Sequence, residues 1–129
     1  WKEASIPSGG RPSWTAPVHC MSQDKAVLLD ILKAARLATG FVSGMDQTTF
    51  NRDPKTQAAV AYQLMIMGEA VKRISEPFRM SHPGIEWKHI AGMRDVLIHD
   101  YDDVDLLIVW ESVTIEIPAL IRQIEPMAR

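Results

Sequence analysis

The chain has 129 residues, a length that suits one domain better than two independent cores. Hydrophobic residues make up 47% and charged residues 23% of the sequence, which is the composition of a globular protein and not of a disordered one. The formal net charge is −2, so nucleic-acid binding would need a local basic patch, assembled within one chain or across subunits.

The first twenty residues differ from the rest of the chain. They contain three prolines, the pair Gly9-Gly10 and no apolar period, and they lack the apolar core of a secretory signal. Met21-Ser22 resembles an ordinary translational start. We therefore expect residues 1–20 to be a disordered or non-native extension and residues 21–129 to form one helical domain. Cys20 is the only cysteine, which excludes an internal disulfide and fits a reducing, cytoplasmic location.

A helical pattern begins at Asp24, with Ser22 as the expected N-cap and Gly44 with Asp46 at the exit. Its apolar positions recur at three- and four-residue steps and predict one buried stripe: Val27, Leu28, Ile31, Ala34, Ala35, Ala38, Phe41, Val42 and Met45.

A polar stretch from Asp46 to Pro54 leads to a second predicted helix, with Asp53 as its cap and Pro54 in its first turn. We expect this helix to end at Glu76-Pro77. Its predicted inward face is Val60, Ala61, Leu64, Met67, Ala70, Val71 and Ile74. Gly68 lies inside this helix, and we interpret it as a place where another helix approaches closely.

Short elements follow the predicted turn at residues 81–84. Residues 85–90 suggest a single helical turn with Trp87 as an apolar plug, and residues 93–99 suggest a short helix. Tyr101-Asp102-Asp103 should break that helix, and Asp102 or Asp103 could cap the next one.

The last predicted helix runs from Asp105 to Glu125, and Pro118 should kink it. It contains the longest apolar run of the chain, Leu106–Trp110, which is far shorter than the roughly 20 residues of a membrane span. Its predicted inward residues are Leu106, Val109, Val113, Ile117, Leu120, Ile121 and Ile124. Together the patterns predict an all-α protein, an antiparallel bundle of four to five helices.

The segment from Arg94 to Tyr101 concentrates ionisable groups beside an apolar core. Arginine offers a permanent charge and a planar donor fork for phosphate, and histidine moves protons near neutral pH. This chemistry suits RNA cleavage by the neighbouring 2′-hydroxyl, which needs no metal; Asp95 could orient either side chain, and Tyr101 adds a hydroxyl. On one helix, however, Arg94 and His99 lie roughly 7.5 Å apart along the axis and about 140° apart around it. They converge only if the helix ends near His99 or if a second subunit completes the pocket.

The pattern Arg94-x4-His99-x-Tyr101 resembles the Arg-x4-His-x-Tyr signature of HepT-like toxins of the HEPN superfamily. The resemblance extends over residues 24–126, through segments at 67–75, 83–87, 90–94, 104–105, 109–110 and 117–120. It implies a HEPN-type bundle that forms a homodimer and acts as a metal-independent endoribonuclease toxin with no cofactor. It also implies a cytoplasmic toxin–antitoxin pair with an MNT-type nucleotidyltransferase antitoxin.

Carried over residue by residue, the resemblance makes Arg94 and His99 the catalytic pair. Tyr101 matches the position that the antitoxin modifies with AMP, which would add an anion beside Arg94. The family often has Asn after the arginine and then a basic residue, whereas this chain has Asp95 and Val96. Asp95 therefore adds negative charge where RNA phosphate should lie.

Charged residues on the second predicted helix and just after it allow more than one interpretation. Lys72 and Arg73, with Arg79, are candidates for an RNA-facing patch, and Glu69 with Arg73 suggests a salt bridge along one helix.

The acidic run at residues 100–105 lacks the glycine and distal glutamate of a calcium loop, so we interpret it as capping and solvation and predict no metal site. His82 and His89 suggest ordinary histidines, and Trp87 and Trp110 core residues. The principal alternative function is a non-catalytic helical module that dimerises and docks a nucleotidyltransferase; a purely structural helical dimer is the third.

Overall fold

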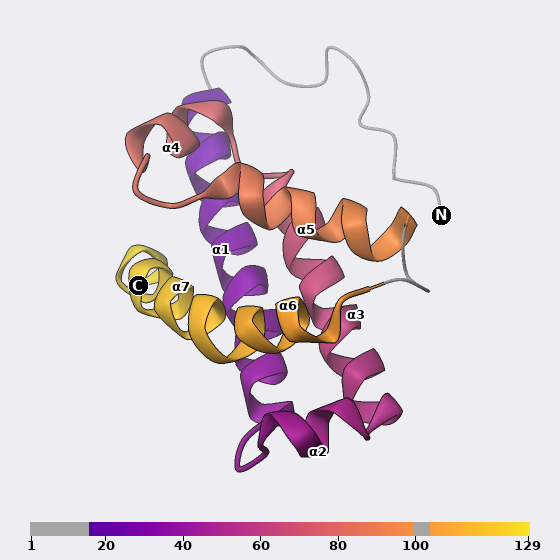
Figure 1. Ribbon diagram of the computed structural model, residues 1–129. Helices are drawn as coiled ribbons and strands as arrows, with labels where there is room; N and C mark the ends of the chain where they lie inside the picture. Colours follow the sequence, from indigo (N-terminus) through magenta and orange to yellow (C-terminus); the bar gives the residue numbers. More distant parts are fainter. Residues whose placement is uncertain (1–15, 100–103) are drawn as a thin grey trace.

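The computed structural model describes the backbone of residues 16–99 and 104–129, and the side chains of residues 23–98 and 104–129. Every regular element in these ranges is helical and none is a strand, which confirms the predicted all-α class (Figure 1). The long segments are α1 (Ala16–Phe41), α3 (Pro54–Val71), α5 (Trp87–His99) and a continuous C-terminal rod. The rod consists of α6 (Leu106–Glu111), a π-helical turn η3 (Ser112–Glu116), α7 (Ile117–Ile124) and a 3-10 turn η4 (Glu125–Ala128). Among these described helices, none combines the length and apolarity that crossing a bilayer requires.

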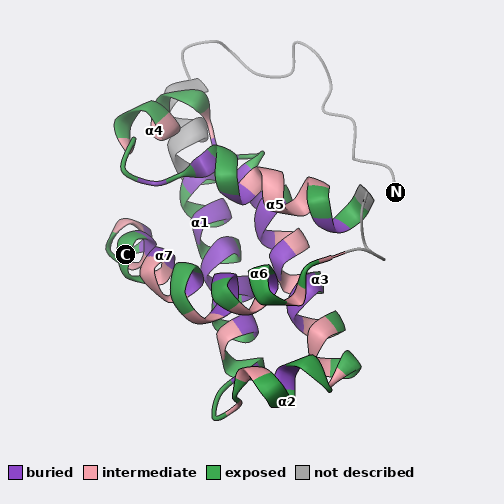
Figure 2. Cartoon of the chain, viewed as in Figure 1, coloured by how far each residue is buried: buried purple, intermediate pink, exposed green. Residues whose placement is uncertain are grey.

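The core lies between α1, α3 and the elements that cover them. α1 packs along α3, α5 packs against α3, and α7 packs against α1. Figure 2 shows the buried residues on the facing sides of these helices. The seven residues predicted to face inward on the second helix are all buried: six lie on α3, and Ile74 lies in the turn after it. The most deeply buried large side chains include Leu28, Ile31, Phe50, Leu64, Met67, Ile117 and Ile124.

The first helix differs from its prediction at both ends. It begins at Ala16, so Ser22 lies inside the helix and the predicted cap is wrong. It ends at Phe41, whose side chain is 40% exposed although the pattern placed it inward. The chain then turns at Gly44, whose φ of 75° lies in the left-handed region that favours glycine.

The polar stretch after this turn contains a short helix that the sequence pattern did not reveal, α2 (Gln47–Asn51). Asp46 caps it by accepting a hydrogen bond from the backbone N–H of Thr49 at 2.8 Å. Its single buried residue, Phe50, packs against Trp110 with ring centroids 5.3 Å apart. α3 then starts as predicted, with Asp53 capping Thr56 and Pro54 in the first turn.

The predicted end of the second helix at Glu76-Pro77 is wrong, because α3 ends at Val71 and these two residues begin α4 (Glu76–Ser81). A buried carboxylate on α1 explains the early end. Asp24 accepts hydrogen bonds from the backbone N–H of Ser75 at 2.8 Å and from its hydroxyl at 2.5 Å. Ser75 in turn caps α4, and a proline fits the first turn of a helix.

The two short elements predicted at residues 85–99 are one continuous helix, α5, which passes through Gly92. Burial of Ile90 and Leu97 on either side of Gly92 offsets the helix propensity that a glycine loses, up to about 1 kcal/mol. Trp87 is a buried plug as predicted, and its indole N–H donates to the carbonyl of His82 at 3.1 Å.

The C-terminal rod is capped by Asp105; the predicted caps Asp102 and Asp103 lie outside the described residues. The expected disturbance before Pro118 takes the form of the π-helical turn η3, in which the N–H of Ile117 donates to the carbonyl of Ser112, five residues back. This turn accommodates a proline ring that would clash with the carbonyl of Thr114 in a regular α-helix.

Candidate active site

The close approach predicted at Gly68 brings α3 against the helix that carries the candidate motif. A side-chain Cβ built at Gly68 would overlap the Cβ of Arg94 and would lie 3.0 Å from the carbonyl oxygen of Ile90. Only a residue without a side chain therefore fits between the two helices. The contact fixes the base of the Arg94 side chain against α3.

The guanidinium of Arg94 is held by two carboxylates. Its Nε lies 2.9 Å from Oε2 of Glu69 on α3 in a salt bridge, and its Nη1 donates to Oδ1 of Asp95 at 3.0 Å. The Arg94 side chain is 29% exposed, whereas the carboxylates are about half exposed. The arginine is thus anchored at its base and at its Nε, with its charge balanced at the surface.

Lys72, which follows α3, joins this cluster through Asp95. Its Nζ donates to the same Asp95 Oδ1 at 3.0 Å. Hydrogen bonds from Lys72 and then from Arg94 hold the pKa of the Asp95 carboxyl below its usual value, so this carboxyl is ionised at neutral pH. Glu69, Lys72, Arg94 and Asp95 form the Arg94 cluster, with two positive and two negative charges.

The predicted salt bridge between Glu69 and Arg73 is wrong. Glu69 binds Arg94, and Arg73 instead pairs with Asp30 of α1 at 3.4 Å. The partnership of Glu69 with Arg94 was missed by sequence reasoning. Gly68 was its only signal, since it indicated a close approach beside Glu69 without saying which helix approaches.

Three predicted site residues differ in how far the structure describes them. Arg94 lies in the middle of the site, as described above. His99 is the last residue of α5, but its side chain lies outside the described residues, as does Tyr101. The pairing of Arg94 with His99 therefore stays a prediction. Of the acidic run, Asp105 caps α6 through the N–H of Leu107 at 2.9 Å, and the other members lie outside the described residues.

An apolar groove adjoins the Arg94 cluster. It has a volume of about 430 Å³ and is lined by Tyr62, Met65, Ile66 and Glu69 of α3 and by Arg94 and Ile98 of α5. Tyr62 is 59% exposed and Ile98 41% exposed, and both line the same groove, so their apolar surfaces adjoin. Arg94 therefore lies at the edge of an exposed apolar surface.

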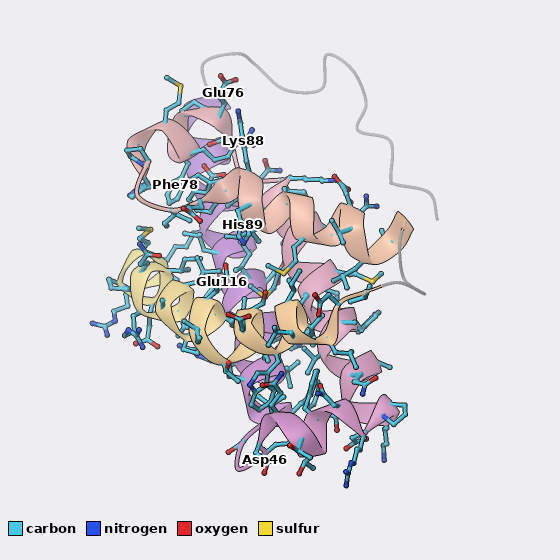
Figure 3. The ribbon with its side chains drawn as sticks, viewed as in Figure 1. Asp46, Glu76, Phe78, Lys88, His89 and Glu116 are labelled. Atoms are coloured by element: carbon cyan, nitrogen blue, oxygen red, sulfur yellow. The ribbon has the colours of Figure 1, made fainter. Side chains whose placement is uncertain are left out.

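A second hollow, of about 330 Å³, lies on another side of α5, against η3 and α7. There His89 and Glu116 face each other across the two elements, with Nε2 and Oε2 2.8 Å apart (Figure 3). Apart from this pair and Glu86, its lining is mostly apolar. This hollow lacks an arginine or lysine among its described lining residues and is the weaker candidate for binding RNA.

The histidines of the described part are engaged with protein partners. His82 Nδ1 lies 3.0 Å from the carbonyl oxygen of Phe78, and its ring stacks on that of Phe78. Within the described side chains, no three His, Cys, Asp or Glu residues gather closely enough to hold a metal ion.

Comparison with known families supplies the decisive observation. The family described as ribonuclease HepT-like matches residues 31–127, which run from within α1 to the C-terminal rod and include the whole Arg94 cluster. The chain belongs to the HepT-like ribonuclease family. The predicted resemblance to the HepT-like family is thereby confirmed, and the protein is an RNase by family.

Comparison with individual proteins supports the same family assignment. The "Probable ribonuclease HepT" of Thermococcus cleftensis is 40% identical over 105 residues, covering 81% of this chain and 96% of that protein. A "Putative RNase" of Caldanaerobacter subterraneus is 39% identical over 105 residues, covering 81% of this chain and 94% of the relative. Another protein with that designation in Methanocaldococcus jannaschii is 40% identical, over 81% of this chain and 90% of its own length. No solved structure shows a significant match.

Proposed function

We propose that this HepT-like protein is the toxin of a toxin–antitoxin pair and a metal-independent endoribonuclease. The observation that carries the proposal is the placement of Arg94. Its side chain is held at its base by the contact with Gly68 and at Nε by Glu69, and it still reaches the surface beside an open groove. A preorganised arginine at this position suits a phosphodiester, because its charge and donors are in place before the substrate arrives.

In the proposed reaction, the RNA supplies its own nucleophile. The 2′-hydroxyl loses its proton and its oxygen bonds to the adjacent phosphorus, while the bond from phosphorus to the 5′-oxygen breaks. His99 accepts the proton from the 2′-hydroxyl or delivers one to the departing 5′-oxygen, and Arg94 stabilises the added charge on the phosphate. The products are a 2′,3′-cyclic phosphate and a free 5′-hydroxyl. Lys72 adds a second cation beside Arg94, whereas Arg73 binds Asp30 at the interface with α1.

The active unit in this proposal is a homodimer formed through the apolar groove. A second copy covering Tyr62, Met65, Ile66 and Ile98 would remove these side chains from water. It would also bring the second Arg94 toward the first, because Arg94 lines the same groove. A shared cleft would resolve the separation of Arg94 and His99 around a single helix.

The proposed partner is a nucleotidyltransferase antitoxin that transfers AMP to Tyr101. In the sequence, Tyr101 is seven residues after Arg94 and two residues after His99, the last residue of α5. An adenylyl phosphate there would supply an anion that competes with RNA for Arg94.

The test compares purified wild type with Arg94→Ala and His99→Ala on single-stranded RNA in the presence of EDTA. We expect the wild type to cleave the RNA and leave cyclic phosphate ends, and the two variants to leave it intact. Expression in bacteria should likewise arrest growth with the wild type and not with the variants. His89→Ala and Arg36→Ala are the matched controls, since each removes the same side-chain type from a surface ion pair away from the cluster. Cleavage that survives both motif substitutions would overturn the proposal.

The second candidate is a docking module without catalysis, and one observation favours it. Two carboxylates balance the two cations of the Arg94 cluster, so its net charge toward RNA is zero. That candidate predicts a stable complex with the nucleotidyltransferase and no RNA cleavage by any variant.

A further inference from the structure

A single carboxylate oxygen joins the two cations of the candidate site. Asp95 Oδ1 accepts a hydrogen bond from Arg94 Nη1 and another from Lys72 Nζ, each at 3.0 Å. The two donors come from different parts of the chain, since Arg94 lies within α5 and Lys72 follows α3. They converge on one point in space, and that point holds an anionic oxygen.

We propose that Arg94 and Lys72 form an oxyanion clamp for the RNA phosphate, and that Asp95 occupies this clamp as an internal anion which the substrate must displace. The inference rests on the proposed ribonuclease function and deepens it by naming what regulates access to the site. The clamp is the phosphate-binding element, and Asp95 is its built-in competitor.

The geometry of the clamp matches phosphate chemistry. A guanidinium N–H and an ammonium N–H here donate charge-assisted hydrogen bonds to one oxygen. A phosphoryl oxygen can accept these two hydrogen bonds as readily as a carboxylate oxygen does. Glu69 binds Arg94 at Nε and leaves Nη1 to the clamp. When Asp95 leaves, Glu69 therefore still holds the guanidinium in position.

The exposure of the cluster makes displacement feasible. The Asp95 side chain is 50% exposed and that of Lys72 is 39% exposed, so water screens their attraction. A surface ion pair of this kind contributes little net stability, and Asp95 can turn into solvent. An RNA that binds several cations at once competes effectively with one local carboxylate. Asp95 thus weakens RNA binding without preventing it.

The experiment separates binding from cleavage by using two RNAs. Binding is measured by fluorescence anisotropy with a labelled mixed-sequence RNA whose 2′-hydroxyls are all methylated, so that it lacks the nucleophile. Cleavage is measured with the unmodified RNA. The proteins are wild type, Asp95→Asn, the double variant Asp95→Asn/Lys72→Met, and Glu125→Gln. Glu125→Gln is the matched control, because it also removes one negative charge from an exposed ion pair. This pair, Glu125 with Arg36, is not part of the Arg94 cluster. Thermal melting of each variant verifies that it folds.

We expect Asp95→Asn to bind the methylated RNA on the order of tenfold more tightly than wild type, because the opened clamp gains one phosphate and a charge-assisted contact is worth about that factor. The logarithmic salt dependence should steepen by roughly 0.7, the value for one further phosphate contact on a single strand. The double variant should lose both gains, and Glu125→Gln should show neither. Equal tightening by Asp95→Asn and Glu125→Gln would overturn the clamp, since it would reflect net charge alone; so would a gain that survives Lys72→Met.

Failure of the ribonuclease proposal gives a different result. Tighter binding by Asp95→Asn with no cleavage by any variant would support the clamp and contradict the enzyme. Cleavage that depends on His99, with unchanged binding by Asp95→Asn, would support the enzyme and contradict the clamp.

Discussion

Gly68 and Arg94 are in backbone-to-side-chain contact across two helices, with the Cα of Arg94 3.3 Å from the position that a Cβ on Gly68 would take. The helix that supports the candidate site and the arginine proposed to act in it are therefore fitted to each other. A methyl group at Gly68 cannot be accommodated by rotating a flexible side-chain end, because the Cβ and backbone of Arg94 are in its way.

Gly68→Ala should lower both stability and activity. Overpacking of this kind costs about 1–3 kcal/mol, which exceeds the gain of up to about 1 kcal/mol in helix propensity. We expect a lower urea midpoint and, because Arg94 shifts relative to Glu69, weaker RNA cleavage. Gly40→Ala is the control: Gly40 lies in α1 with open space around its Cβ position, so the same change should be neutral or stabilising. A Gly68→Ala protein as stable and active as wild type would contradict the close approach.

A charge on the apolar groove should separate the proposed dimer. Ile98→Glu places a carboxylate in the surface that the second copy would cover, and we expect sedimentation to change from dimer to monomer. RNA cleavage should fall with it if the two motifs share one cleft. Ile115→Glu is the matched control, because Ile115 is 63% exposed and lines the other hollow. Dissociation by Ile115→Glu but not by Ile98→Glu would place the dimer interface at the hollow beside η3 and would contradict an interface at the apolar groove.

Asp24→Ala should lower the free energy of unfolding more than removal of an exposed carboxylate does. Asp24 is 4% exposed and accepts both the N–H and the hydroxyl of Ser75, so its loss leaves two partly buried donors without this partner. We expect a cost of about 1–3 kcal/mol in urea unfolding. Asp30→Ala, which breaks an exposed pair with Arg73, should cost at most about 1 kcal/mol. Equal effects of the two changes would contradict the role of Asp24 in fixing the turn before α4.

Acid should unfold the protein partly through its helix caps. The pKa of Asp53 is lowered by hydrogen bonds from the Thr56 hydroxyl and then its N–H, and that of Asp46 by the N–H and then the hydroxyl of Thr49. A carboxyl whose folded pKa lies below the ordinary value of 3.8 adds stability above that value, and this stability is lost as pH falls through the folded pKa.

Unfolding midpoints measured from neutral pH to about pH 2.5 should therefore fall in the acidic part of the range. Asp53→Asn keeps an acceptor for the cap but does not titrate, so it should flatten this fall. An unchanged pH profile in that variant would show that the Asp53 cap contributes nothing to acid sensitivity.

The helical faces could be predicted from the sequence because burial repeats with the helical period. On α3, every predicted inward residue is buried, from Val60 to Val71. The helix ends were less predictable, because distant residues determine them. Glu76-Pro77 has the local signature of a helix end, yet the carboxylate of Asp24, about fifty positions earlier, turns the same residues into a helix start.

The candidate site shows the same division. Arg94 and Asp95 could be singled out from residue types and from the motif, and Gly68 from its unusual place in a helix. The choice of partner could not, since Glu69 has Arg73 four residues ahead on its own helix. The tertiary approach at Gly68 instead offers it Arg94, which is less exposed than the Arg73 side chain. A less exposed partner attracts a carboxylate more strongly because water screens it less.

The π-helical turn before Pro118 has a consequence for how the C-terminal rod keeps its phase. Val109, Val113 and Ile117 are all buried, although two successive steps of four residues would drift by about 80° around a regular α-helix. The wider turn at residues 112–116 absorbs this drift and keeps the three side chains in line. The turn thus holds one residue more than an α-helical turn, and this extra residue keeps the buried side of the rod facing the core. Without the wider turn, a regular α-helix would carry Ile117 about 80° around the axis from Val109 and would turn the buried side of α7 away from α1.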